Sequence, residues 1–245
     1  MGGEIIVKKI MAIVTVGMRQ MLADPVQIMF IFALPILMTW IMSFLPVEAY
    51  EMAILGVLVM FVALNLITSA GGYILDEKQT GTWQRILAST TSYWHIMTAY
   101  FIRLFVIALV QSIVLLLSGK YLFGAPWNHG YGEMMVVLIV YIFAMTGLGL
   151  FLAGFVKSQG QVQAVAMGVV MVGTMLGGVF FPIDEASGVI RLIATVSPQS
   201  WAAGALKDIL TMGVGLSSLA APLVWMTAIG MALLFGGVVK LQMEG

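Results

Sequence analysis

Long apolar segments with almost no charged residues dominate this sequence. A helix needs about 20 consecutive apolar residues to cross the roughly 30 Å hydrocarbon core of a bilayer. Six segments meet this requirement, and the third of them contains Arg103 as the only charged residue in the set. They are residues 26–44, 52–75, 93–119, 134–156, 161–182 and 219–239. We therefore predict an all-α membrane protein with six transmembrane helices in a single domain over residues 1–245.

Composition agrees with this fold class and excludes several functions. Only 9% of the residues are charged and 61% are hydrophobic, whereas soluble domains carry roughly a quarter charged residues. The net charge is zero, which gives no basic field for nucleic acid. There is no cysteine for thiolate catalysis or a metal site, and His95 and His129 are isolated. We predict no catalytic residues and no metal site.

Lysine and arginine are unevenly divided between the two sides that these spans define. If both termini are cytoplasmic, the cytoplasmic side receives eight of these residues and the outer side three. The eight are Lys8, Lys9, Arg19, Lys78, Arg85, Arg103, Lys157 and Lys240, and the three are Lys120, Arg191 and Lys207. Because lysine and arginine accumulate in cytoplasmic loops, we predict a multi-pass protein of the cell (plasma or inner) membrane with both termini cytoplasmic.

The N-terminal residues 4–23 have the pattern of an amphipathic helix. Glu4, Lys8, Thr15 and Arg19 fall within a narrow arc, while isoleucines, Val14 and Met21 occupy much of the remainder. This pattern is typical of a helix lying in the membrane interface, and an irregular leader is the alternative. Asp24-Pro25 then predicts an N-cap and a first helical residue for the first span.

Residues 183–210 are too polar for a span and too apolar for a free loop. Gly177, Gly178 and Pro182 are expected to stop the fifth span, and Pro198 divides the following residues into pieces at about 186–195 and 199–210. Apolar pieces of this length are more often re-entrant or interfacial than spanning. We predict a re-entrant outer helical hairpin before the last span.

Polar residues inside the spans are few. Asn65, Thr68 and Gln111 are candidates for the substrate pathway, together with Ser69 and Ser112. The alternative for all of them is helix–helix hydrogen bonding, which the residue types favour. No aspartate, glutamate or lysine lies deep in a span, whereas an ion-coupled carrier usually places one there.

The segment DEKQTGTWQRILAST, residues 76–90, separates the second span from the third. Gly81 breaks the second helix, and Thr82 can cap a new one through its hydroxyl. Trp83, Ile86 and Leu87 then share one helix face, and Arg85 lies on another. We predict a short amphipathic helix within residues 76–91 that docks on a soluble partner.

Two sequence patterns, in this order along the chain, resemble the permease subunits of ABC-2 type transporters. The first is Glu77-x3-Gly81-Thr82-x2-Arg85, followed by a short Thr/Ser stretch and a span. The second is Gly177-Gly178-x-Phe180-Phe181-Pro182-Ile183, then Ser197-Pro198 and Trp201. With the amphipathic N-terminal helix and the six spans, the resemblance covers essentially the whole chain.

The resemblance implies the transmembrane half of a compact ABC exporter for a lipophilic or amphipathic substrate, such as a drug, an antibiotic, a lipid or a glycolipid. It implies a second permease copy or paralogue and two copies of a separate ATP-binding subunit. The sequence contains no GxxxxGK[ST] motif, so ATP and Mg²⁺ are expected in that partner, and no cofactor or enzymatic site in this chain. By carry-over, Glu77, Gly81, Thr82 and Arg85 belong to the coupling helix. The alternatives are a secondary, ion-coupled transporter and a non-transporting membrane scaffold.

Overall fold

The fold is a bundle of long helices, and no strand occurs in the described residues. The computed structural model describes residues 2–81, 83, 93–125, 127, 129–180 and 188–243. The helices are α1 (Gly2–Ala23), α2 (Pro25–Ile28), α3 (Leu34–Met42), α4 (Val47–Gln79), α6 (Tyr93–Leu117), α7 (Tyr131–Ala153), α8 (Gln159–Met171), α9 (Val189–Val196), α10 (Pro198–Met212) and α11 (Ala220–Met243). Three π-helical turns, Met29–Ala33, Ser118–Leu122 and Val172–Leu176, continue α2, α6 and α8, and a 3₁₀ turn, Leu216–Leu219, precedes α11.

Six helical segments in the described residues are long and apolar enough to cross a membrane. They are Pro25–Met42, Ala49–Gln79, Trp94–Leu122, Tyr131–Ala153, Gln159–Leu176 and Leu216–Met243. This confirms the predicted number of spans and their order. The second span continues one turn beyond the predicted end, because α4 carries Asp76, Glu77 and Lys78 in its last turn before it stops.

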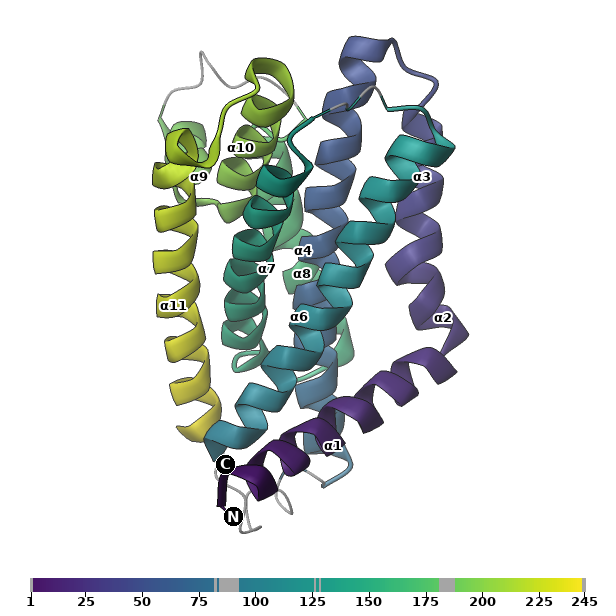
Figure 1. Cartoon of the computed structure of the whole chain (residues 1–245). Coiled ribbons are helices and arrows are strands. Elements are labelled where there is room, and N and C mark those ends of the chain that lie inside the picture. The colour runs from purple at the N-terminus through teal and green to yellow at the C-terminus, as the bar shows by residue number, and fades with distance from the viewer. Residues whose placement is uncertain are drawn as a thin grey trace.

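Helix α4 lies in the middle of the bundle, where α3, α6, α7, α8 and α10 contact it (Figure 1). On the other side of α7 lies α11, and glycines bring these two helices together. A Cβ added at Gly147 would lie 2.6 Å from the carbonyl oxygen of Gly230, and one at Gly237 would lie 2.6 Å from the backbone nitrogen of Phe151. Small residues allow helix backbones to approach this closely inside a membrane.

Both termini lie at one end of the bundle, which we call the terminus end (Figure 1). The opposite end, which carries α9 and α10, is called the hairpin end (Figure 1). Helix α1 runs obliquely across the terminus end and packs against α6. Its buried face contains Val14, Gly17 and Met21, whereas Lys8, Thr15 and Arg19 are exposed. The helix predicted over residues 4–23 is therefore present, and its placement in a membrane interface stays a prediction.

The turn from α1 into the first span forms at Asp24, as the sequence indicates. The Asp24 carboxylate accepts hydrogen bonds from the backbone N–H groups of Val26 and Gln27, at 2.9 and 3.2 Å. Pro25 occupies the first helical position of α2. These contacts satisfy donors that a helix start leaves without intrahelical partners.

At the hairpin end, α9 and α10 form two short helices that meet at Ser197. Their bounds differ from the predicted 186–195 and 199–210 by a few residues, because Pro198 itself is the first residue of α10. The loop before α7 packs under this pair, since a Cβ at Gly130 would collide with Ile209 of α10. The re-entrant placement of this hairpin in the outer leaflet stays a prediction.

Candidate functional site

The terminus end of α4 carries the start of the predicted coupling segment. Helix α4 ends at Gln79, and Gly81 follows with a φ of 71°. This left-handed conformation is open to glycine and costly for residues with a Cβ. Trp83 then places its indole in the interior, where the side chain is 3% exposed and belongs to the main apolar core. The segment that leaves α4 is therefore anchored in the bundle two residues after the turn.

Several predicted site residues lie outside the described residues. Thr82 and Arg85 of the coupling segment and Pro182 of the hairpin region belong to this group. The amphipathic helix predicted within residues 76–91 is therefore described only as far as Gly81, together with Trp83. Their roles stay predictions.

Glu77 lies on the last turn of α4 and contacts α6. Its carboxylate lies near the Tyr100 side chain of α6. Glu77 is half-buried, while the neighbouring Asp76 is exposed. The residue that the sequence assigns to coupling thus joins the ends of two adjacent spans.

Arg103 lies one turn further along α6 and is 6% exposed. Its guanidinium stacks on the Tyr73 ring, with Cζ 3.6 Å from the ring centroid. Gly17 of α1 covers the guanidinium from the other side, because a Cβ there would lie 2.5 Å from Cζ. Sequence reasoning counted Arg103 only as a charge near a span end. Its isolation in an apolar segment could have indicated a buried site with specific contacts, because buried charges need partners.

A second polar group lies inside the bundle, where α4 and α6 face the first span. Asn65 Nδ2 donates to Gln111 Oε1 at 2.8 Å, and Ser69 Oγ donates to Asn65 Oδ1 at 3.0 Å. Gln111 Nε2 in turn donates to the Ile31 carbonyl at 2.9 Å. In an α-helix the Ile31 carbonyl would accept a hydrogen bond from the N–H of residue 35, but Pro35 has no N–H. The glutamine amide takes the place of this backbone donor.

These contacts bear on the candidates for the substrate pathway. Asn65 and Gln111 are buried and bonded to each other, which is the helix–helix role that the sequence left open as the alternative. Thr68 is half-buried, and its hydroxyl donates to the carbonyls of Leu64 and Asn65 on its own helix. A role of these three side chains in substrate contact stays a prediction.

The hairpin residues pack against the hairpin end of the fifth span. Gly178 has a φ of 77° just after the π-helical turn that continues α8. At the start of α10, the amide of Gln199 lies flat against Gly173, where a Cβ would lie 2.5 Å from both Cδ and Nε2. Gln199 is 2% exposed, its Oε1 accepts from Ser197 Oγ at 2.7 Å, and its Nε2 has no acceptor among the described residues. The glycines at this site make room for α10.

One carbonyl holds three hairpin-end helices together. The Thr195 carbonyl of α9 accepts from Trp201 Nε1 of α10 at 2.8 Å and from Trp225 Nε1 of α11 at 3.0 Å. Backbone carbonyls in the last turn of a helix lack intrahelical donors, and both indoles supply one. The hairpin is thereby tied to the last span.

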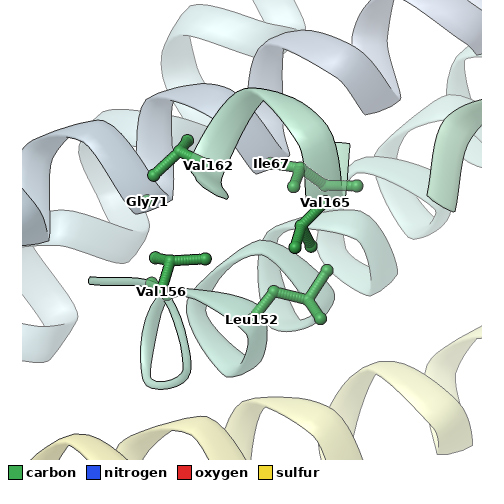
Figure 2. A pocket seen from close by; sticks show the side chains of 7 residues that line it. Ile67, Gly71, Leu152, Val156, Val162 and Val165 are labelled. Carbon is green, nitrogen blue, oxygen red and sulfur yellow. The ribbon is translucent and has the colours of Figure 1, made fainter. Parts of the chain in front are cut away.

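An apolar crevice lies between α4, the end of α7 and the start of α8 (Figure 2). It is a shallow, partly open depression, and its lining is aliphatic or glycine throughout. The lining residues are Ile67, Gly71, Leu152, Ala153, Val156, Val162 and Val165. It offers no group for acid–base chemistry. Within the part of the chain that the structure describes, no cluster of three or more histidine or carboxylate side chains is arranged to hold a metal.

Comparisons of the sequence with known proteins identify its family. The family model described as "ABC-2 type transporter" matches residues 8–211, well over half of the chain. The Linearmycin resistance permease protein LnrN of Bacillus subtilis (strain 168) is 32% identical over 158 residues, which cover 64% of this chain and 40% of that protein. ABC transporter G family member 20 of Dictyostelium discoideum is 24% identical over 142 residues, which cover 58% of this chain and 20% of that protein. The matches thus span less than half the length of these curated relatives.

Proposed function

Because this chain belongs to the ABC-2 type transporter family, we propose that it is the permease subunit of an ATP-driven exporter. It works with two copies of an ATP-binding subunit, which hold ATP and Mg²⁺, and with a second permease copy or a paralogue. It resides in the cell membrane with both termini cytoplasmic, so the terminus end faces the ATP-binding subunits. The chain itself transports and does not hydrolyse ATP.

The burial of Trp83, two residues after Gly81, carries this proposal. A loop that only connected two spans would not need a large aromatic side chain in the bundle core. With Trp83 buried in the apolar core of the bundle, a push on residues 76–91 is transmitted to the two spans that this segment joins. Glu77, Gly81, Thr82, Trp83 and Arg85 are assigned to this coupling element, with Thr82 and Arg85 assigned from the resemblance alone.

The second permease subunit is proposed to cover the exposed face of α8. Met167, Met171 and Met175 repeat along this face and are 53%, 43% and 38% exposed. Gly168 lies beside them, and a Cβ added there would meet no atom of the described residues within 4 Å. Methionine side chains adapt to irregular apolar surfaces. Two such faces opposite each other form an apolar path that suits a lipophilic or amphipathic substrate.

The related resistance permease supports the substrate class. That relative is named for linearmycin resistance, and we extend only the class, a lipophilic or amphipathic molecule, to this chain. An apolar path whose polar groups are hydrogen-bonded within the protein suits a lipophilic substrate, because such a path offers no ligands to a small ion. Transport of lipophilic dyes and antibiotics in vesicles that contain both subunits measures the range of substrates.

Co-purification tests the central claim. The tagged permease is expected to retain a P-loop ATPase encoded beside it, and Arg85→Glu is expected to abolish the complex or its coupled ATP hydrolysis. Lys157→Glu is the matched control, since Lys157 is an exposed cation at the same end. If Arg85→Glu retains both the complex and its coupled ATP hydrolysis, the assignment of Arg85 to the coupling element is wrong. Transport driven by an ion gradient without any ATPase would favour a secondary transporter instead.

Cysteine cross-linking tests the paired permease. The sequence contains no cysteine, so Gly168→Cys creates a single thiol on the α8 face. Oxidation is expected to produce a disulfide-linked permease pair through this residue. Val224→Cys on α11, an exposed residue away from α8, is the control and is expected to stay monomeric. A dimer through Val224→Cys alone would move the interface to α11.

A further inference from the structure

The Nε of the buried Arg103 guanidinium has no hydrogen-bond acceptor among the described residues. The guanidinium stacks on the ring of Tyr73, and its Nε is enclosed. A cation–π contact offsets only part of the cost of removing a guanidinium from water. The position seen here is therefore not a deep energy minimum for this side chain.

Glu77 is a candidate acceptor for this guanidinium on the same α4–α6 interface. Glu77 follows Tyr73 by one helical turn on α4, and Tyr100 precedes Arg103 by nearly one turn on α6. Because α4 and α6 run in opposite directions, the pairs Tyr73–Arg103 and Glu77–Tyr100 lie on successive levels of the same interface. A helical side chain leans toward the start of its helix, so Arg103 leans toward the level of Glu77.

The same guanidinium holds α1 in place. Gly17 lies on the buried face of α1, and the guanidinium occupies the space that any larger residue at that position would fill. A change of rotamer that moves the guanidinium away from Gly17 removes a contact between α1 and α6 and leaves a gap beneath α1. Movement of Arg103 and movement of α1 are therefore linked.

We propose that Arg103 is a positioning residue that alternates between two partners. In the state described here it stacks on Tyr73 beneath Gly17 and holds α1 against α6. In the second state it forms an ion pair with Glu77, and α1 is released. This proposal rests on the proposed function, because Glu77 begins the segment that receives the motion of the ATP-binding subunit. Arg103 then relays that motion to α1.

A single thiol on the packed face of α1 measures its release. Val14 is 7% exposed against α6, whereas Val16 on the same helix is 56% exposed. In the cysteine-free chain, reaction of Val14→Cys with N-ethylmaleimide therefore requires α1 to open, and Val16→Cys reacts without opening. The ratio of the two rates, measured on the permease alone in lipid nanodiscs, reports the open population.

The proposal predicts opposite effects from two substitutions. Glu77→Gln keeps the size of the side chain but no longer attracts the guanidinium, so labelling of Val14→Cys is expected to slow by about tenfold, equal to about 1.4 kcal/mol of opening free energy. Gly17→Ala displaces the guanidinium and is expected to speed labelling by a similar factor. Asp76→Asn removes the same charge from the same helical turn at an exposed site and is expected to change nothing.

Unchanged or faster labelling in Glu77→Gln would overturn the proposal, because a purely structural Arg103 has no second partner. Arg103→Lys keeps the charge but loses the planar stack, and it must label faster than the parent. In the complex with the ATP-binding subunit, a non-hydrolysable ATP analogue is expected to speed labelling of the parent and not of Glu77→Gln. If no ATPase assembles with this chain, the proposed function fails, while labelling of the permease alone still decides whether Arg103 alternates.

Discussion

Asn65 on α4 donates a hydrogen bond to Gln111 on α6 at 2.8 Å, in the interior of the bundle. The same glutamine reaches the carbonyl of Ile31, so one side chain joins three spans. An amide supplies both an acceptor and donors, and Gln111 uses each of them. The arrangement explains why a chain with so few polar residues places two of them at facing positions.

Replacing Gln111 is expected to destabilise the bundle rather than alter its substrate range. Gln111→Leu leaves the Asn65 amide and the Ile31 carbonyl without their partner, and hydrogen bonds between spans are worth about 0.6 to 1.7 kcal/mol each. We expect a lower midpoint of thermal unfolding in nanodiscs. Ser112→Ala is the control, because the Ser112 hydroxyl donates to the Ala108 carbonyl on its own helix. Unchanged stability with altered transport would instead assign Gln111 to the substrate pathway.

Gly81 is expected to tolerate only residues that adopt a left-handed backbone. A Cβ there meets no atom of the described residues within 4 Å, so the expected penalty comes from the φ of 71°. Gly81→Val is expected to cost about 1–2 kcal/mol in this turn and to reduce permease-stimulated ATP hydrolysis. Gly81→Asn is expected to retain most of it, since asparagine visits this conformation. Equal loss in both variants would mean that side-chain size, not backbone conformation, matters at this turn.

The two tryptophans at Thr195 are expected to substitute for one another. Trp201→Phe or Trp225→Phe removes one N–H donor, while the carbonyl keeps the other. Each single change is expected to lower the free energy of unfolding by under about 1 kcal/mol, and the double change by more than the sum. A double-mutant cycle by denaturant titration measures this. Trp40→Phe, at a half-exposed indole on α3, is the control; additive effects would show that the carbonyl is not shared.

Glycine is expected to be required at position 173 for stability, because the Gln199 side chain occupies the space that a Cβ would need. Gly173→Ala places a methyl group against a buried amide, and overpacking of this kind costs about 1–3 kcal/mol. We expect a lower unfolding midpoint, and we expect Gln199→Ala to restore it in the double variant. Gly168→Ala, in open space on the same helix, is the matched control. Failure of the second substitution to rescue the first would place the clash elsewhere.

Features that depend on neighbouring residues could be predicted from the sequence. The six spans follow from local hydropathy, and the structure confirms them. The Asp24-Pro25 helix start follows from the chemistry of a cap, which involves only the next three residues. The end of α4 before Gly81 follows in the same way, because backbone conformation is a property of that residue. The hairpin helices were predicted in the right place with shifted ends.

What only the tertiary structure decided is which distant residues meet. The sequence contains Asn65, Gln111 and Ile31 in three separate spans, and hydropathy carries no information about the rotation of each helix around its axis. That rotation is set by packing, through glycines such as Gly17 that allow one particular neighbour to approach. Arg103 looked like a charge near a span end; its stack on Tyr73 beneath α1 exists only because three helices converge on it. The membrane-spanning character is thus local in origin, whereas the contacts proposed to relay motion arise from the packed bundle.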